Sequence, residues 1–561
     1  MSLSRHVNPQ RVLDESREHS RKSGRTDVHA LLGRERPSQL EHGPLADKER
    51  YGTETIPKFA IPSKGVPAKE AYELVHSELE LDGTPLLNLA SFVHTDMDEY
   101  GTRIMTENMA KNLIDGDECK FAFPFLPYPA TTLLHGRCIS MLAKLWHADD
   151  YRENATGTAT TGSSEAIQLG GLAMKKRWQE KMKAQGKNPY APGPNIIMGA
   201  NAQVALEKFA RYFDVEARMV PVDASTNYVM DPKRAMQYVD ENTIGVFVIL
   251  GSTYTGHYEN VELMAHLLDE YETKTGISVP IHVDGASGAM FAPFATPQLK
   301  WDFSCSKRIV SINTSGHKWG KAYVGVGFVI WRDKHHLPKD LVFELHYLGS
   351  VEYSFSLNFS RPAAPVLAQY FNLIYLGFDG YRRISLHDAK NARLFARALE
   401  RSKYYTVVSD IHKPKEASLT EKAKQATGIA DDIDSYVPAL PVVAFKFTDE
   451  FKKEYPRIKQ RSIQKLLREN NWIVPNYELP PNVENEEVLR VVMREKFNED
   501  MVERLVIDVI GVTEQLMEEH RNNVAHPGSG LSQKRNNHRH AEKQAANHGE
   551  GIRPTGHDAV C

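Results

Sequence analysis

Residues 243–250, TIGVFVIL, form an almost unbroken apolar run that is rich in β-branched side chains. A strand of this composition is typical of a parallel sheet that helices cover on both faces. A helical pattern follows at 260–276, and two more strand-like segments follow at 279–288 and 308–312. This alternation predicts an α/β fold with a largely parallel sheet. Such sheets bind ligands outside the carboxyl ends of their strands, so the residues that follow the strands are the candidate site.

The chain is long enough for more than one domain, because single cores rarely grow beyond about 250–300 residues and this chain has 561. A helical segment at 387–400, followed by strand-like segments at 441–447 and 489–497, predicts a smaller α/β domain near the C-terminus. We therefore predict five regions: a flexible N-terminal extension (1–57), an N-terminal segment (58–110), a large domain that binds the ligand (111–385), a small C-terminal α/β domain (386–520) and a disordered tail (521–561). The tail is rich in histidine, which leaves metal binding as the alternative to disorder.

Composition narrows the class of protein. The formal net charge of −3 argues against a surface that binds nucleic acid, where a strong basic excess is expected. The 4 cysteines are widely spaced and form neither a disulfide framework nor a zinc motif, so we expect a reducing, cytoplasmic location. No apolar run approaches the length of about 20 residues that a membrane span requires, and the first residues lack the apolar core of a signal peptide.

A lysine occupies an unusual position in SINTSGHKWGKAYVGVG, residues 311–327. Lys318 directly follows His317 on a turn between the strand-like segments 308–312 and 324–331. A lysine on such a turn either extends its amine to solvent or provides a nucleophilic amine, as in Schiff-base chemistry. This segment alone does not separate the two alternatives.

Other strand ends carry further polar groups. A Gly-Ser-Ser turn at 162–164 begins a helical pattern, where it suits a phosphate or, alternatively, an ordinary serine N-cap. Asp284 ends a strand in HVDGASG, where a carboxylate coordinates a metal, caps a helix or holds a proton on a heteroaromatic nitrogen. Thr253 ends the preceding strand, and Ser360 precedes an Arg-Pro pair. A phosphate cradle, a carboxylate and a lysine at successive strand ends are what pyridoxal 5'-phosphate (PLP) requires.

The ordered motifs TGSSEA, HVDGASG and SGHK make the sequence similar to the glutamate decarboxylases. These are group II PLP-dependent decarboxylases with the aspartate-aminotransferase-like fold, PLP fold type I. The resemblance extends over about 58–518 and includes LNLASF, KFARYFDVE, GSTYTGHYE, NFSRPAAPV and LRVVMRE. It implies an α/β fold with a mainly parallel sheet in the large domain, and decarboxylation of L-glutamate to 4-aminobutanoate and CO2.

The resemblance also implies roles for individual residues. Lys318 would form the Schiff base with PLP, and Asp284 would pair with the pyridine nitrogen. The other implied cofactor contacts are Ser163, Ser164 and His317 at the phosphate, Thr253, Ala286 beside Asp284, Gln203 over the ring face, and Ser360 from a neighbouring subunit. The implied substrate contacts are Ser91, Asn112 and Asp115 for the side-chain carboxylate and Arg490 for the α-carboxylate, with Arg494 as the alternative. Lys318 and His317 are both candidate donors of the proton that returns to Cα, and no metal is expected.

Three features differ from the family pattern. Apolar residues are inserted in GDECKFAFPFLPYPATTLLHGRC, directly after the predicted substrate contacts, and position 91 is serine where some relatives have threonine. Plant members end in a Trp-containing basic helix that binds calmodulin, whereas the last tryptophan here is Trp472, so calmodulin is not an expected partner. We expect a homodimer or a higher homo-oligomer. The alternatives are a related decarboxylase with another amino-acid substrate and a non-catalytic scaffold of the same fold.

Overall fold

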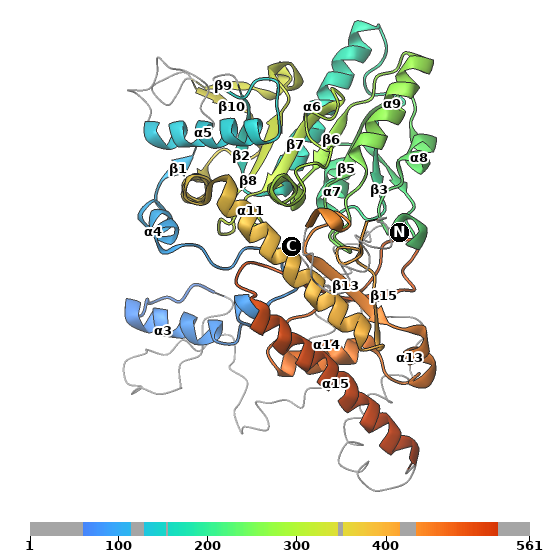
Figure 1. Cartoon of the computed structure of the whole chain (residues 1–561). Coiled ribbons are helices and arrows are strands. Elements are labelled where there is room, and N and C mark those ends of the chain that lie inside the picture. The colour runs from blue at the N-terminus through green and yellow to red at the C-terminus, as the bar shows by residue number, and fades with distance from the viewer. Residues whose placement is uncertain (1–59, 114–127, 153–154, 346–351, 416–432, 526–561) are drawn as a thin grey trace. The chain divides into compact units, whose positions relative to one another are not determined.

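The computed structural model describes residues 60–113, 128–152, 155–345, 352–415 and 433–525 (Figure 1). The chain divides into two units, with the boundary between Gly83 and Thr84. In the first unit, the described residues contain the helix α3 (Ala68–Leu79), which has no buried residue. All other helices and strands described below belong to the second unit. Among the described residues, no helix is long and apolar enough to cross a membrane.

A seven-stranded sheet is the centre of the second unit. Its strands lie in the order β2 (Thr156–Thr160), β8 (Gly327–Trp331), β7 (Ile309–Ser315), β6 (Ile281–Asp284), β5 (Thr243–Ile249), β3 (Asn195–Gly199) and β4 (Glu216–Val220). Only β8 runs antiparallel to its neighbours β2 and β7, and the other described pairs are parallel. The predicted largely parallel sheet is confirmed, as are the strands predicted at 243–250, 279–288 and 308–312.

Helices cover both faces of this sheet, as the apolar β5 requires. Val246 and Val248 of β5 pack in the same core as α9 (Val261–Thr275). Phe247 and Ile249 point the other way and pack with α6 (Ser163–Ala184) and α7 (Val204–Tyr212). The predicted helix 260–276 is confirmed as α9, which ends where Gly276 adopts the left-handed φ of 74°.

A second sheet of four antiparallel strands lies in the C-terminal part of the chain. Its order is β12 (Tyr405–Val407), β13 (Val442–Phe447), β15 (Glu487–Val492) and β14 (Asn476–Glu478), with the helices α13 (Asp449–Glu454), α14 (Gln460–Glu469) and α15 (Glu499–Ala525) nearby in sequence. The long α11 (Ala364–Arg401) crosses residue 385, and α15 continues past residue 520. The domain boundaries predicted after residues 385 and 520 therefore fall inside α11 and α15.

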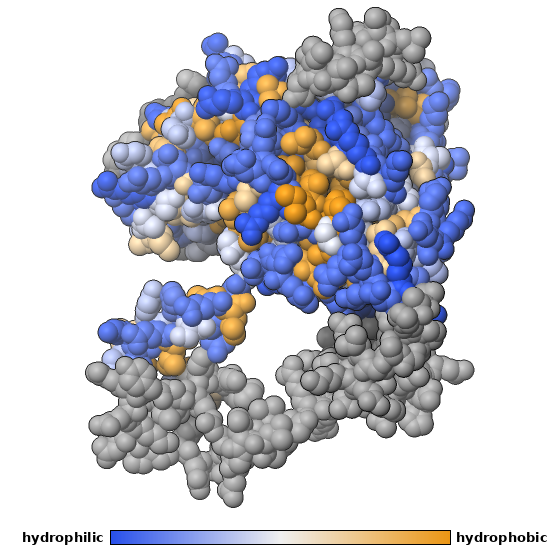
Figure 2. Space-filling view, turned by 60° about the horizontal axis from the view of Figure 1, so that its bottom comes forward, coloured by the Kyte–Doolittle hydropathy of each residue, from blue (hydrophilic) through white to orange (hydrophobic). Residues whose placement is uncertain are grey.

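Shorter elements complete the second unit. They are α4 (Glu99–Glu107), α5 (Pro129–Leu145), α8 (Pro232–Ala235), α10 (Ala292–Ala295), and the strand pairs β1 (Asn112–Leu113) with β11 (Arg361–Pro362) and β9 (Phe343–Leu345) with β10 (Glu352–Ser354). α11 is interrupted at Gly377, where the backbone leaves the helical conformation. The face in Figure 2 is mostly hydrophilic, with hydrophobic residues gathered in its middle.

Candidate active site

Six of the predicted site residues line one small cavity at the carboxyl ends of the parallel strands. They are Ser163, Gln203, Thr253, Asp284, Ala286 and Lys318. Each ends a strand or follows one, and only Asp284 and Ala286 share a strand, β6, so the fold brings together residues that are far apart in sequence. Asn201, Ser287 and Gly251 also line this cavity, with the apolar Ile167 and Ile249.

Lys318 places its amine inside this cavity. Its Nζ lies 3.4 Å from the hydroxyl of Ser287 and 5.3 Å from the centroid of the Phe92 ring. The lysine is half-buried. The amine therefore lies against cavity residues, which favours the nucleophilic interpretation over a lysine that extends to solvent.

Asp284 is a buried carboxylate at the end of β6. Its Oδ1 accepts hydrogen bonds from Asn313 Nδ2 at 3.0 Å and from the backbone N–H of Ala286 at 3.1 Å. Burial raises the pKa of Asp284, whereas these two hydrogen bonds and the charge of Lys318 act in the opposite direction. A cationic group in the cavity would favour the ionised carboxylate further. No group of three potential metal ligands exists among the described residues.

The turn before α6 forms the polar end of the cavity. Gly162 occupies the N-cap position and no side chain caps the helix, so the alternative of an ordinary serine N-cap is wrong. Ser163 Oγ accepts a hydrogen bond of 2.8 Å from Ser315 Oγ. β8 approaches this turn so closely that a Cβ on Gly327 would lie 2.5 Å from the carbonyl carbon of Gly162. The first N–H groups of α6 are the kind of donors that bind phosphate.

The two other residues predicted at the phosphate differ in position. Ser164 is exposed and does not line the cavity. His317 lies beside the turn, since a Cβ on Gly162 would be 3.1 Å from His317 Cε1. Its Nδ1 is buried without a hydrogen-bond partner among the described residues. Burial and the neighbouring charge of Lys318 lower the pKa of His317 to about 4, so this imidazole is neutral near pH 7.

Arg490 reaches the same region from the second sheet. Its side chain is 0 % exposed, and it donates to the carbonyl oxygens of Thr253, at 2.8 Å, and of Ala90. Its guanidinium lies 4.8 Å from the centroid of Phe92, whose ring also contacts Lys318. Its Nε has no hydrogen-bond partner, and no ion pair with a described carboxylate is found. A buried cation without an acid is costly, so this position favours an anionic ligand.

Arg494, the alternative to Arg490, has a different environment. It donates to the carbonyl oxygens of Val93, Asn88 and Pro85. These three carbonyls belong to one backbone segment, and Arg494 holds that segment in place. The structure therefore favours Arg490 as the residue available to a ligand.

The residues predicted to contact the substrate side chain do not line the cavity. Ser91 precedes Phe92, and its Oγ accepts from the N–H of Val93 at 3.1 Å. Asn112 Nδ2 donates to Ser360 Oγ at 3.3 Å, and Asn112 Oδ1 accepts from the N–H of Arg361 at 3.0 Å. Asn112 and Ser360 therefore lie together, and neither is among the residues that surround Lys318. Asp115 lies outside the described residues.

The sequence did not reveal several residues of this site. Ser287 lies in the HVDGASG motif and Phe92 directly follows Ser91, so proximity in sequence was an available signal. Asn201 and Asn313 lie in segments that were expected to be near the site, but nothing in the pattern distinguishes them from ordinary polar residues.

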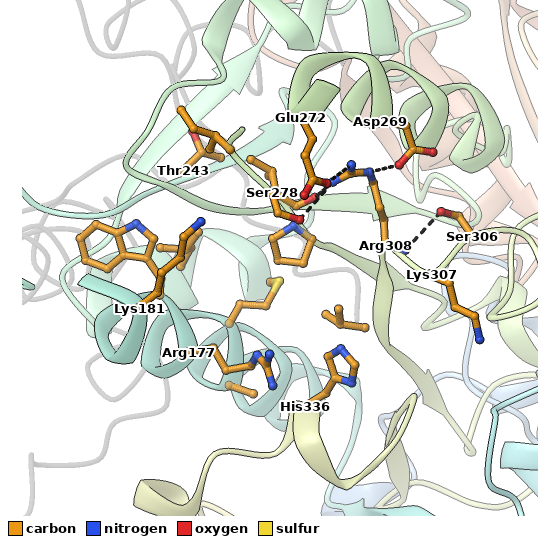
Figure 3. Close-up of a pocket in the computed structure, with 18 of the residues that line it drawn as sticks. Arg177, Lys181, Thr243, Asp269, Glu272, Ser278, Ser306, Lys307, Arg308 and His336 are labelled. Atoms are coloured by element: carbon orange, nitrogen blue, oxygen red, sulfur yellow. Dashed lines mark hydrogen bonds and ion pairs between the residues drawn. The ribbon is translucent and has the colours of Figure 1, made fainter. Parts of the chain in front are cut away.

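A larger cavity opens at the other end of the parallel strands (Figure 3). Its lining includes Thr243, with which β5 begins, and Arg308, which directly precedes β7. Arg308 pairs there with Asp269 and Glu272 of α9. None of the predicted site residues lines this cavity. Size alone therefore does not identify the site, and the smaller cavity is the candidate site because the predicted residues line it.

Comparison with known proteins agrees with this geometry. Residues 64–416 match the pyridoxal-dependent decarboxylase conserved domain. The chain is 46% identical over 479 residues to glutamate decarboxylase of Saccharomyces cerevisiae, which covers 82% of this chain and 79% of that protein. It is 44% identical to glutamate decarboxylase of Solanum lycopersicum, with 83% and 84% covered.

Solved structures give the same result. A glutamate decarboxylase of Lactobacillus brevis has a TM-score of 0.72 and 35% identity, and covers 82% of this chain and 96% of its own. A structure of TDC from Oryza sativa with PLP has a TM-score of 0.61 at 16% identity, covering 92% and 100%. The second likeness concerns the fold alone. The predicted PLP fold type I is thus confirmed.

Proposed function

Since this chain belongs to the pyridoxal-dependent decarboxylase family, we propose that it uses PLP to convert L-glutamate to 4-aminobutanoate and CO2. The relatives from Saccharomyces cerevisiae and Solanum lycopersicum carry the name glutamate decarboxylase, which supports this substrate. One observation carries the proposal. The amine of Lys318 and the buried, acid-free guanidinium of Arg490 contact the same ring, that of Phe92. A nucleophilic amine and an anion site are therefore close together.

The residues present fit the cofactor. Lys318 would bind its aldehyde carbon, Asp284 would face its ring nitrogen, and the turn with Ser163 would hold its phosphate, with His317 beside it. Gln203, Thr253 and Ala286 line the same cavity and would contact the ring and its substituents. When bound, PLP supplies a ring that accepts the electron pair released as the bond to the carboxylate breaks.

The protein's own groups bind and orient the substrate and supply the proton. Arg490 would hold the α-carboxylate at the edge of the cavity. Each turnover releases CO2 and adds one proton to Cα. With a pKa of about 4, the imidazole of His317 is almost entirely unprotonated near pH 7, so it is a poor proton donor. The amine of Lys318 lies in the cavity, so we assign the proton to Lys318.

The contacts to the distal carboxylate extend the proposal to a second copy of the chain. We propose that Ser91, Asn112 and Asp115 contact this carboxylate and that Ser360 contacts the phosphate in a neighbouring subunit. The hydrogen bond between Asn112 and Ser360 supports one consequence. If Ser360 serves the neighbour, Asn112 serves the same neighbouring site.

An exposed apolar surface supports self-association. α11 packs against both α4 and α5, and all three helices expose large apolar side chains. These are Tyr100, Leu133, Met141, Ile374 and Tyr375. Exposed apolar clusters are typical of protein interfaces, so we propose that this surface lies between copies in a homodimer or a larger homo-oligomer. We also propose a cytoplasmic location, where free cysteines such as Cys138 and Cys305 stay reduced.

Product analysis over a panel of amino acids tests the function. The purified protein, supplied with PLP, is incubated with L-glutamate, L-aspartate and the aromatic amino acids, and CO2 and amines are measured. We expect 4-aminobutanoate as the main product. A preference for another amino acid would identify a related decarboxylase, and the absence of any amine would support a non-catalytic scaffold.

A further inference from the structure

A chain of four buried polar side chains leads away from the candidate cofactor site. Ser311 Oγ lies 2.7 Å from His282 Nδ1, His282 Nε2 lies 2.7 Å from Asn313 Oδ1, and Asn313 Nδ2 lies 3.0 Å from Asp284 Oδ1. Asp284 is 4 % exposed and the other three side chains are 0 % exposed. The chain follows the register of the sheet, because His282 is opposite Ser311 and Asp284 is opposite Asn313 on β6 and β7.

When Asp284 is ionised, its carboxylate fixes the direction of every hydrogen bond in this chain. A carboxylate only accepts, so Asn313 must present its NH2 group to Asp284 and its carbonyl oxygen to His282. His282 must then donate from Nε2, which leaves Nδ1 as the acceptor for the hydroxyl of Ser311. This arrangement requires a neutral imidazole. Burial lowers the pKa of His282 to about 4, which agrees with that requirement.

Close packing holds the imidazole in this orientation. α6 passes so near that a Cβ on Gly170 would lie 2.4 Å from His282 Nδ1. On another side, the ring of Phe247 meets the imidazole edge to face, with 5.4 Å between the centroids. The ring of His282 therefore has little room to turn, and its hydrogen bonds keep their direction.

The two donors at Asp284 both use the same oxygen. Asn313 and the N–H of Ala286 bind Oδ1, and no described residue donates to Oδ2. Oδ2 is left for a group in the cavity that Asp284 lines. An Asn313 that turned by 180° would present its carbonyl oxygen to the carboxylate and repel it.

We propose that His282 is a positioning residue for cofactor binding, which fixes Asn313 so that Asp284 presents Oδ2 as an anion to the ring nitrogen of PLP. The inference rests on the proposed use of PLP, but it assigns a new role to a residue that touches neither cofactor nor substrate. Through Asn313 and Asp284, His282 affects only the contact to the ring nitrogen and leaves the phosphate and aldehyde contacts unchanged.

Cofactor binding to the apoprotein tests this role without relying on turnover. The probes are PLP and its deaza analogue, in which a carbon replaces the ring nitrogen while the aldehyde and phosphate remain. Dissociation constants for both are measured with wild type, His282→Phe, His282→Gln and Ser311→Ala. His412→Gln is the control, because His412 is also buried and pairs with Glu400 at 3.1 Å, remote in sequence from this chain of residues.

We expect His282→Phe to weaken PLP binding by about tenfold or more, since Asn313 loses its partner and no longer holds its NH2 group toward the charged Asp284, and to leave the affinity for the deaza analogue unchanged. His282→Gln keeps an amide N–H for Asn313 and should restore most of the PLP affinity. Ser311→Ala, the mildest change, should show a smaller loss confined to PLP, and His412→Gln should alter neither affinity.

Two outcomes would overturn the proposal. Equal losses for both probes would mean that His282 supports the cavity as a whole, and unchanged PLP affinity in His282→Phe would mean that Asp284 needs no such support. If His282→Phe does not fold, Ser311→Ala decides by the same comparison, since a loss confined to PLP supports the proposal and an equal loss for both probes, or no loss, overturns it. A wild type that binds PLP but decarboxylates no glutamate would refute the proposed function and leave this test intact.

Discussion

We expect turnover to depend on Lys318 more than on any other side chain. Replacing it with alanine removes the amine that lies between Ser287 and Phe92, and arginine cannot form the covalent bond to the cofactor. We expect Lys318→Ala and Lys318→Arg to lower turnover on the order of 10³-fold or more, as measured by CO2 release. Lys300→Ala is the control, because Lys300 forms an exposed pair with Glu262. Substantial activity in Lys318→Ala would return this residue to the solvent-directed interpretation.

Arg490 and Arg494 are both buried, so a paired test separates a ligand contact from a structural one. Arg490→Lys should raise the KM for glutamate by about tenfold or more, because a buried hydrogen bond to a charged group is lost. Arg494→Lys loses contacts to backbone carbonyls and should lower the melting temperature with little change in KM. Steady-state kinetics and thermal unfolding of both variants check this. The reverse assignment of effects would make Arg494 the carboxylate ligand.

The loop after β5 carries Thr253 and contacts the second sheet through Arg490 of β15. His257 in this loop pairs with Asp410 at 3.0 Å and with Thr255 Oγ1 at 2.7 Å. Burial alone would raise the pKa of Asp410, but hydrogen bonds from His257 and Lys413 outweigh it and lower the pKa to about 2. The loop is thus fixed by an ionised carboxylate close to the residue that accepts a hydrogen bond from Arg490.

This pair predicts a pH-dependent stability. A carboxyl group whose folded pKa is depressed stabilises the protein above its unfolded pKa, and loses that contribution as the pH falls through the folded value. Asp410→Asn should therefore cost about 2 kcal/mol of unfolding free energy at pH 6. The difference from wild type should shrink below about pH 4 and vanish near pH 2. Denaturant unfolding at several pH values measures this difference, and a difference independent of pH would exclude the ionised carboxylate of Asp410 as its source.

Strands and helices with strong patterns were predictable, whereas contacts that depend on register were not. The apolar run of β5 and the terminal Gly276 of α9 identify these elements from local chemistry alone. The pairing of His282 with Asn313 depends instead on how β6 aligns with β7, which no local pattern encodes. Likewise, Asn112 meets Ser360 only because the short strands β1 and β11 pair across a long stretch of chain.

The proposed assembly into oligomers would complete each site with residues of a second chain. Asn112 and Ser360 form a hydrogen-bonded pair that does not line the cavity around Lys318 of the same chain. In a symmetric dimer, such a pair can complete the site of the other copy, so that each site draws residues from two chains. An isolated chain would then carry Lys318 and Arg490 but lack part of the distal-carboxylate and phosphate contacts.

Mixed oligomers provide the decisive test of this arrangement. A chain with Lys318→Ala keeps an intact Asn112–Ser360 pair, and a chain with both Asn112→Ala and Ser360→Ala keeps an intact Lys318. Each variant alone should be weakly active or inactive. When the two are refolded or expressed together, half of random dimers are mixed and each has one complete site, so about a quarter of the wild-type activity should return.

A mixture of Lys318→Ala chains with Arg490→Met chains is the control, because Lys318 and Arg490 are both assigned to the cavity of their own chain. A mixed dimer of this pair has one defect in each cavity, so no activity should return. Recovery in this control would mean that Arg490 acts across the interface. The shared site is supported if activity returns in the mixture of Lys318→Ala with the Asn112→Ala, Ser360→Ala chain and sedimentation shows a single oligomeric species. A fully active monomer would refute it.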